Sequence, residues 1–120
     1  MEADLKDRNV VKKVADEAVK AMGNVNILFN NAAFQEVIQD PVKDLSEDHW
    51  VQTFDTNIHP FWFLSKYLIP QMKRGDTIIN NGSINAYVGR PDLLAYTSTK
   101  GAIIAFTRGL HNAIISTGIR

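Results

Sequence analysis

Two short apolar segments, set between helical patterns, constrain this chain more than any other feature. Residues 25–30, VNILFN, form an uninterrupted apolar run, and residues 77–80, TIIN, form a second one. Helical patterns precede, separate and follow them, at residues 9–22, 46–68 and 93–115. An alternation of helices and short apolar strands is typical of crossover units in a parallel sheet. We therefore predict an α/β fold, with the first strand buried on both faces.

Helix boundaries follow from a few residues. Gly23 suits a helix C-terminus, and Ser46 suits the N-cap of the next helix. Pro60 lacks the N–H of a continuous helix, which predicts a kink or a freed carbonyl near Asn57. Residues 89–92, Gly-Arg-Pro-Asp, are expected to form the turn before the last helix.

Two strands are too few for a complete parallel sheet. Each strand of such a sheet needs neighbours, and each face needs helices. The two apolar segments would leave edges unpaired. We therefore interpret residues 1–120 as a single partial domain, taken from the middle of a larger one.

Composition excludes several classes of protein. Of 120 residues, 45% are hydrophobic, and 13 basic side chains balance 13 acidic ones, so neither disorder nor a nucleic-acid or anionic-membrane partner is expected. There is no cysteine, and the charged start resembles no signal peptide, so the cytoplasm is the expected location. The three histidines have no partner at metal-ligand spacing and are interpreted as surface or packing residues, with no metal site: His49, His59 and His111.

A serine, a tyrosine and a lysine are the candidate reactive residues. Tyr96 and Lys100 are four positions apart, on one face of the last predicted helix, and Ser83 follows the second strand. A nearby ammonium favours the phenolate, so the pair could exchange a proton with a substrate. The alternatives are a packing tyrosine, a solvated lysine, and a serine that caps a turn or helix.

These residues belong to a longer set that resembles the short-chain dehydrogenase/reductase family. The segment NILFNNAA, residues 26–33, is similar to the family's strand and Asn-Asn-Ala-Gly turn, and Tyr96 to Lys100 is similar to its Tyr-x-x-x-Lys motif. Asn57 and Ser83 lie where the family keeps an asparagine and a serine. Residues 83–108 most resemble the glucose/ribitol dehydrogenase-like members.

The resemblance implies a partial Rossmann fold (a doubly wound parallel sheet) that lacks its first and last strands. It also implies hydride transfer between NAD or NADP, with NADP slightly favoured, and a small alcohol or carbonyl, such as a sugar or polyol. Tyr96 would be the general acid/base, Lys100 would tune it and hold the nicotinamide ribose, and Ser83 would hold the substrate oxygen. Asn57 would support a water near Lys100; its alternative is a plain helix residue.

The resemblance also implies cofactor contacts away from the reactive residues. The turn Asn31, Ala32 and Ala33 would run under the adenosine half of the cofactor, with alanine in place of the usual glycine. Asp4 and Leu5 resemble a family pair that touches the adenine; the alternative for Asp4 is an acidic residue in a helix first turn.

The family's glycine-rich phosphate turn has no counterpart here, because no G-x-x-x-G-x-G occurs in the chain. We therefore expect these 120 residues alone to bind a nicotinamide cofactor weakly or not at all. The resemblance also implies a homo-oligomer, a dimer or tetramer formed through the two long helices. Two rival interpretations stay open: a non-catalytic remnant that acts as an oligomerisation or interaction module, and a cofactor sensor.

Overall fold

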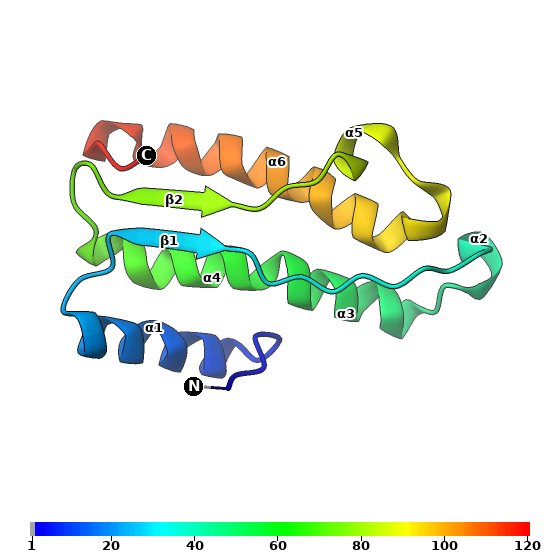
Figure 1. Cartoon of the computed structure of the whole chain (residues 1–120), viewed down its shortest axis with the longest axis horizontal. Helices are drawn as coiled ribbons and strands as arrows, with labels where there is room; N and C mark the ends of the chain where they lie inside the picture. The colour runs from blue at the N-terminus through cyan, green and yellow to red at the C-terminus, as the bar shows by residue number, and fades with distance from the viewer. Residues whose placement is uncertain (1) are drawn as a thin grey trace.

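A computed structural model describes residues 2–120, and Figure 1 shows helices and strands alternating along them. The longer elements are α1 (Arg8–Met22), β1 (Ile27–Asn30), α3 (Glu47–Asn57), α4 (His59–Leu68), β2 (Thr77–Asn80) and α6 (Leu94–Ile114). The short elements are α2 (Pro41–Asp44), α5 (Asn85–Val88) and the 3-10 turns Ile69–Gln71, Pro91–Leu93 and Ile115–Thr117.

The two strands pair in parallel, as the helix–strand alternation predicts. Ile27 lies opposite Thr77 and Asn30 lies opposite Asn80, so partners differ by 50 in number. The connection between the strands runs through α3 and α4, as Figure 1 shows. Because the strands are parallel, both of their carboxyl ends lie at the same edge of the sheet.

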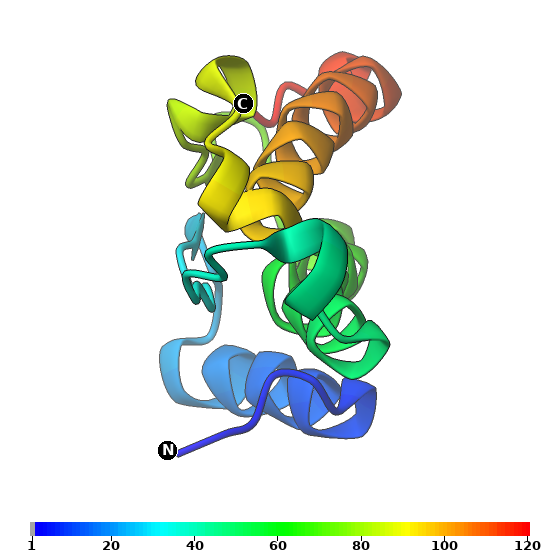
Figure 2. The ribbon, with the colours of Figure 1, turned by 90° about the vertical axis from the view of Figure 1, so that its right-hand side faces the viewer.

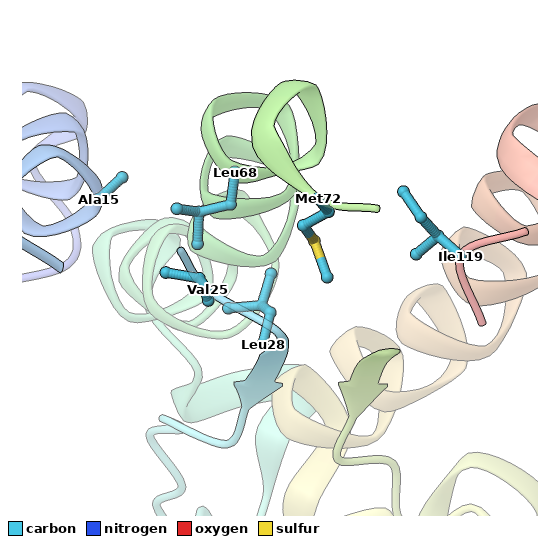
Figure 3. Packing of buried hydrophobic residues seen from close by; sticks show 6 residues of the cluster. All are labelled: Ala15, Val25, Leu28, Leu68, Met72 and Ile119. Atoms are coloured by element: carbon cyan, nitrogen blue, oxygen red, sulfur yellow. The ribbon is translucent and has the colours of Figure 1, made fainter. Parts of the chain in front are cut away.

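One face of the sheet carries the core. Figure 2 shows α4 and α6 on the same side of the strands, and α1 packs against α4. Figure 3 shows buried side chains between the strands and the helices. The buried cluster comprises Ala15, Val25, Leu28, Leu68, Met72 and Ile119.

The opposite face of the sheet is exposed. Ile27 is 64% exposed, Phe29 57% and Ile79 45%, whereas Leu28, which points to the helices, is 7% exposed. The prediction that the first strand is buried on both faces is therefore wrong for this chain. Successive side chains of a strand point to opposite faces, and among residues 2–120 the long helices cover only one of them.

The helix boundaries agree with their sequence signals. Gly23 follows α1 with φ +74°, and the Ser46 hydroxyl accepts from the His49 N–H at 3.1 Å at the start of α3. The break expected near Asn57 is confirmed, because α3 ends at that residue and α4 starts at His59, with Pro60 in its first turn.

The tail after α6 returns to the sheet. The Arg120 N–H donates to the Asp76 carbonyl at 2.9 Å, and the Ile78 N–H donates to the Arg120 carbonyl at 2.7 Å. This is the bond pattern of a third parallel strand at its first residue.

Candidate functional site

The candidate site lies at the carboxyl edge of the two strands. The chain leaves β1 at Asn31 and leaves β2 at Asn81, and the Asn81 N–H donates to the Asn30 carbonyl at 2.9 Å. The short helix α5 follows β2, and Figure 1 shows it above the first turns of α6. The segment that follows β2 therefore lies beside the helix that carries Tyr96 and Lys100.

Lys100 is the most unusual residue of this region. It is 1% exposed, and its Nζ donates to the Asn81 carbonyl oxygen at 2.8 Å. Burial lowers the pKa of the Lys100 ammonium below its ordinary value. Lysine is almost never fully buried unless it has a partner, so the alternative of a solvated surface lysine is wrong.

Tyr96 lies beside this ammonium. The Lys100 Nζ is 5.4 Å from the centroid of the Tyr96 ring, as expected for residues one helical turn apart. At this distance the two side chains interact, and the face of the ring attracts the charge. Tyr96 is half-buried, which leaves part of its side chain accessible.

Ser83 joins the same edge from the segment after β2. It comes two residues after Asn81, whose carbonyl holds Lys100, and its Oγ accepts from the Asn85 N–H at 3.1 Å. The sequence alternative of a capping serine therefore has structural support. A hydroxyl that accepts one bond still has its own proton to donate, so capping and substrate binding are compatible.

Asn57 is fully buried and connects three segments. Its Oδ1 accepts from the Phe34 N–H at 2.6 Å, and its Nδ2 donates to the Phe34 carbonyl at 2.9 Å and to Thr99 Oγ1 at 3.0 Å. Thr99 Oγ1 in turn donates to the Tyr96 carbonyl at 2.7 Å. Asn57 is therefore more than a plain helix residue: it fixes the loop after β1 to the helix that carries Tyr96.

The sequence analysis did not identify two of these residues, Thr99 and Asn81, as part of the site. The roles seen here depend on a backbone carbonyl and on a neighbour 42 positions away. The position of Asn81 directly after a strand was the one available signal.

The predicted cofactor turn is open to solvent. Asn31, Ala32 and Ala33 are all exposed and follow β1. Leu5 lies near this turn: with Asn31, Ala32 and other residues it lines a cavity of about 60 Å³. The N-terminal segment thus lies beside the turn.

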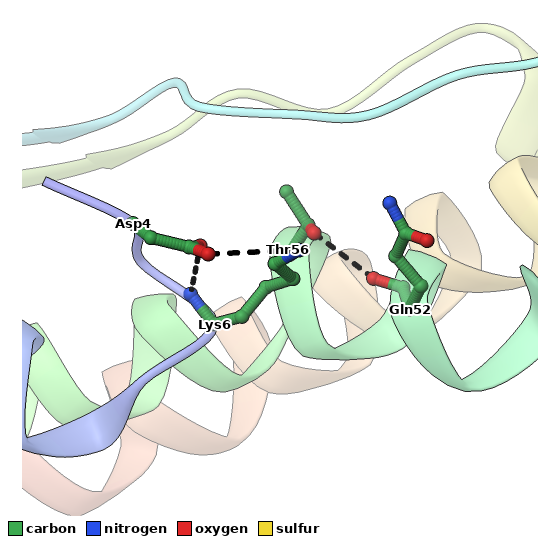
Figure 4. A network of polar contacts seen from close by, with 4 residues as sticks. All are labelled: Asp4, Lys6, Gln52 and Thr56. Carbon is green, nitrogen blue, oxygen red and sulfur yellow. Dashed lines mark hydrogen bonds and ion pairs between the residues drawn. The ribbon is translucent and has the colours of Figure 1, made fainter. Parts of the chain in front are cut away.

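The Asp4 side chain interacts with Lys6 of the same segment. Its carboxylate accepts from the Lys6 N–H at 3.0 Å and lies 3.6 Å from the Lys6 Nζ, as Figure 4 shows. Helix α1 starts later, at Arg8 with Asp7 as its cap, so the alternative of an acidic residue in the first turn of this helix is wrong.

Two of the histidines, His49 and His59, lie beside carboxylates. His59 Nδ1 lies 2.8 Å from Asp55 Oδ1, and His49 Nδ1 lies 3.3 Å from Glu36 Oε2. Within residues 2–120, no three His, Asp or Glu side chains are grouped as a metal site would require. None of the helices in this part of the chain combines the length and the apolar character needed to cross a membrane.

A family model described as short chain dehydrogenase matches residues 1–120. The chain therefore belongs to the short-chain dehydrogenase/reductase family, and the resemblance drawn from its motifs is confirmed.

The relatives that match this chain are longer proteins. Glucose and ribitol dehydrogenase of Daucus carota is 47% identical over 118 residues, which are 98% of this chain and 40% of that protein. NADPH-dependent aldehyde reductase 1, chloroplastic, of Arabidopsis thaliana is 44% identical over 109 residues, 91% of this chain and 38% of that protein. The chain thus spans about two fifths of the length of these relatives.

The fold is confirmed by solved structures. A short chain dehydrogenase from Burkholderia cenocepacia, in complex with NADP, superposes with a TM-score of 0.92 at 27% identity. The match covers 99% of this chain and 48% of that one. The two-stranded unit is therefore a partial Rossmann fold, as predicted.

Proposed function

We propose that this chain supplies the proton-transfer half of an NAD(P)-dependent oxidoreductase site. In this proposal the reaction interconverts an alcohol and a carbonyl, and a sugar or polyol is the substrate class suggested by the name of the carrot relative. One observation supports the assignment above all: the buried Lys100 ammonium interacts with both the Asn81 carbonyl and the Tyr96 ring.

Tyr96 acts in this proposal as the general acid or base. It donates its phenolic proton to a carbonyl oxygen in reduction and accepts a proton from the alcohol in oxidation. The adjacent Lys100 ammonium stabilises the phenolate that is left after donation. Ser83, whose oxygen is fixed by the Asn85 N–H, donates its own proton to the substrate oxygen as negative charge develops there.

The residues present fit part of a nicotinamide cofactor. Lys100 has three N–H donors, one of which binds Asn81, so it can also bind ribose hydroxyls. The exposed turn of Asn31, Ala32 and Ala33 has small side chains that permit close approach, with Leu5 beside it. A bound cofactor would supply or accept the hydride. NADP is favoured over NAD because two relatives are named for NADPH or solved with NADP.

The pyrophosphate has no such fit in this chain, which contains no glycine-rich phosphate turn. Each lost hydrogen bond to a charged group costs about 1.5–3 kcal/mol of binding free energy. We therefore expect NADPH to bind the 120 residues weakly or not at all. Titration with NADPH, followed by its fluorescence, checks this expectation, and micromolar binding would contradict it.

A segment exchange tests the catalytic assignment. Residues 1–120 replace the matching segment of the carrot glucose and ribitol dehydrogenase, which supplies the other three fifths of a domain. The hybrid should oxidise ribitol or glucose with NADP, and Tyr96→Phe should lower kcat at least about 100-fold. NADPH binding by both hybrids serves as the control for folding. A Tyr96→Phe hybrid that binds NADPH and keeps its full rate would contradict the role of Tyr96.

The second candidate is an interaction module without catalysis. Trp62 on α4 is 47% exposed, and an assembly surface on the long helices would cover it, which would make the protein a homo-oligomer. Sedimentation of the wild type and of Trp62→Glu tests this surface, since the charge should shift the protein toward monomer. A cytoplasmic location remains part of the proposal.

A further inference from the structure

Amide side chains connect the two strands at three levels of the register. Each connection joins residues 50 positions apart, as the pairing of Ile27 with Thr77 requires. The three bonds are Asn26 Nδ2 to Asp76 Oδ1 at 2.8 Å, Asn30 Nδ2 to Asn80 Oδ1 at 2.9 Å, and Asn81 Nδ2 to Asn31 Oδ1 at 2.8 Å.

The third bond lies at the carboxyl end of the two strands. It lies beyond the last residues that pair within the sheet, where both chains have entered their turns. Asn31 and Asn81 are both exposed, so water competes for the bond and its contribution to stability is small. Sheet stability alone therefore gives little reason for this contact.

Asn81 makes two further bonds from its backbone. Its N–H donates to the Asn30 carbonyl at 2.9 Å, and its carbonyl accepts from the Lys100 Nζ at 2.8 Å. The side-chain bond to Asn31 and the bond to Lys100 therefore start from one residue. A displacement of the Asn81 backbone would therefore move both of them.

We infer that Asn81, held by Asn31, is a positioning residue for the Lys100 ammonium. The side-chain bond fixes the turn after β2 against the turn after β1, which holds the Asn81 carbonyl where Lys100 can reach it. Its importance for catalysis rests on the proposed function, since Asn31 belongs to the expected cofactor turn and Lys100 to the proton-transfer pair. The contact would thus couple these two parts of the site.

The accessibility of Lys100 to a lysine reagent measures this positioning directly. The 120-residue chain, without cofactor or substrate, is pulse-labelled with acetic anhydride, and acetylation of each lysine is followed by peptide mass spectrometry. Loss of the bond in Asn81→Ala should raise the Lys100 labelling rate about fivefold, the population change for one net hydrogen bond. Asn31→Ala breaks the same bond from the other side and should give the same increase.

Two matched variants separate positioning from general loosening of the sheet. Asn26→Ala removes the cross-strand bond at the other end of the same strands and should leave Lys100 labelling at the wild-type rate. Asn31→Asp keeps an oxygen that can accept from Asn81 Nδ2, so it should restore slow labelling.

The inference is overturned if both alanine variants label Lys100 at the wild-type rate, or if Asn26→Ala accelerates labelling equally. Circular dichroism checks that each variant is folded, and should Asn81→Ala fail to fold, Asn31→Ala and Asn31→Asp still decide the matter. Because no cofactor or turnover is involved, this result is independent of the hybrid-enzyme experiment.

Discussion

At each end of the sheet an asparagine forms a hydrogen bond to a charged side chain, and the two charges behave differently. At the amino end, Asn26 donates to the Asp76 carboxylate, which also accepts from the Lys73 N–H at 2.6 Å. These bonds, the one from Asn26 first, lower the pKa of Asp76. At the carboxyl end, Asn81 holds Lys100, whose pKa is lowered by burial.

Both pKa values are lowered, but the consequences for stability are opposite. For Asp76 the folded state favours the charged form, so ionisation stabilises the fold. For Lys100 the folded state disfavours the charged form, so the ammonium costs stability at neutral pH. One end of the sheet is thus built to hold the fold together, and the other keeps an unfavourable charge, as sites for chemistry often do.

The largest effect is expected from Asn57→Ala, at the carboxyl end. The substitution leaves the Phe34 N–H and carbonyl without their side-chain partner and removes the donor to Thr99. Unsatisfied buried groups of this kind should lower the free energy of unfolding by about 2–4 kcal/mol. Urea denaturation measures the change.

Thr56→Ala is the matched control for Asn57. Its hydroxyl bonds only to the Gln52 carbonyl within its own helix, as Figure 4 shows, so the loss should stay within about 0.5 kcal/mol. Equal losses for both variants would contradict the special role of Asn57.

An intermediate effect, of opposite sign, is expected from Lys100→Met. Methionine has a similar length and no charge, and Asn81 is an exposed residue, so its carbonyl can bind water instead. The variant should be more stable than the wild type by about 1 kcal/mol at pH 7. The gain should shrink as the pH rises through the folded pKa of Lys100, because the wild-type amine is then neutral. A Lys100→Met protein that is less stable than the wild type at pH 7 would contradict the claim that the buried ammonium costs stability.

The smallest effect is expected at the amino end, from Asp76→Asn. The wild type should have the higher Tm at pH 7, where the carboxylate is ionised. Because its folded pKa lies below the unfolded value of 3.8, this advantage is complete above that pH and disappears as the pH falls through the folded pKa. Thermal melts of both proteins between pH 2 and 7 measure it, and a constant Tm difference would be the contrary result.

Much of the fold was predictable from local signals. The strand at residues 77–80 and the caps at Ser46 and Gly23 agree with the structure, because each depends on a few adjacent residues. The exposure of Phe29 was not predictable, since it depends on which segments cover the sheet. The short helix α5 was also missed: its four residues carry no periodic pattern.

Some features of the site were predictable from local sequence, and others were not. Tyr96 and Lys100 could be paired from their spacing, because four residues make one helical turn. The burial of Lys100, the Asn81 carbonyl that holds it, and the contact of Asn57 with Phe34 join segments 19 or more positions apart. Such contacts follow from the packing of the chain and have no local signature.

The most direct test of the site is the titration of Lys100. Lysine labelled with ¹³C at Cε reports each ammonium separately by NMR, and Lys100 can be assigned by its absence from the spectrum of Lys100→Met. Lys100 should titrate below its ordinary value of 10.5. A Lys100 that titrates at this ordinary value would show a solvated ammonium, and the proposed proton-transfer site would then lose its support.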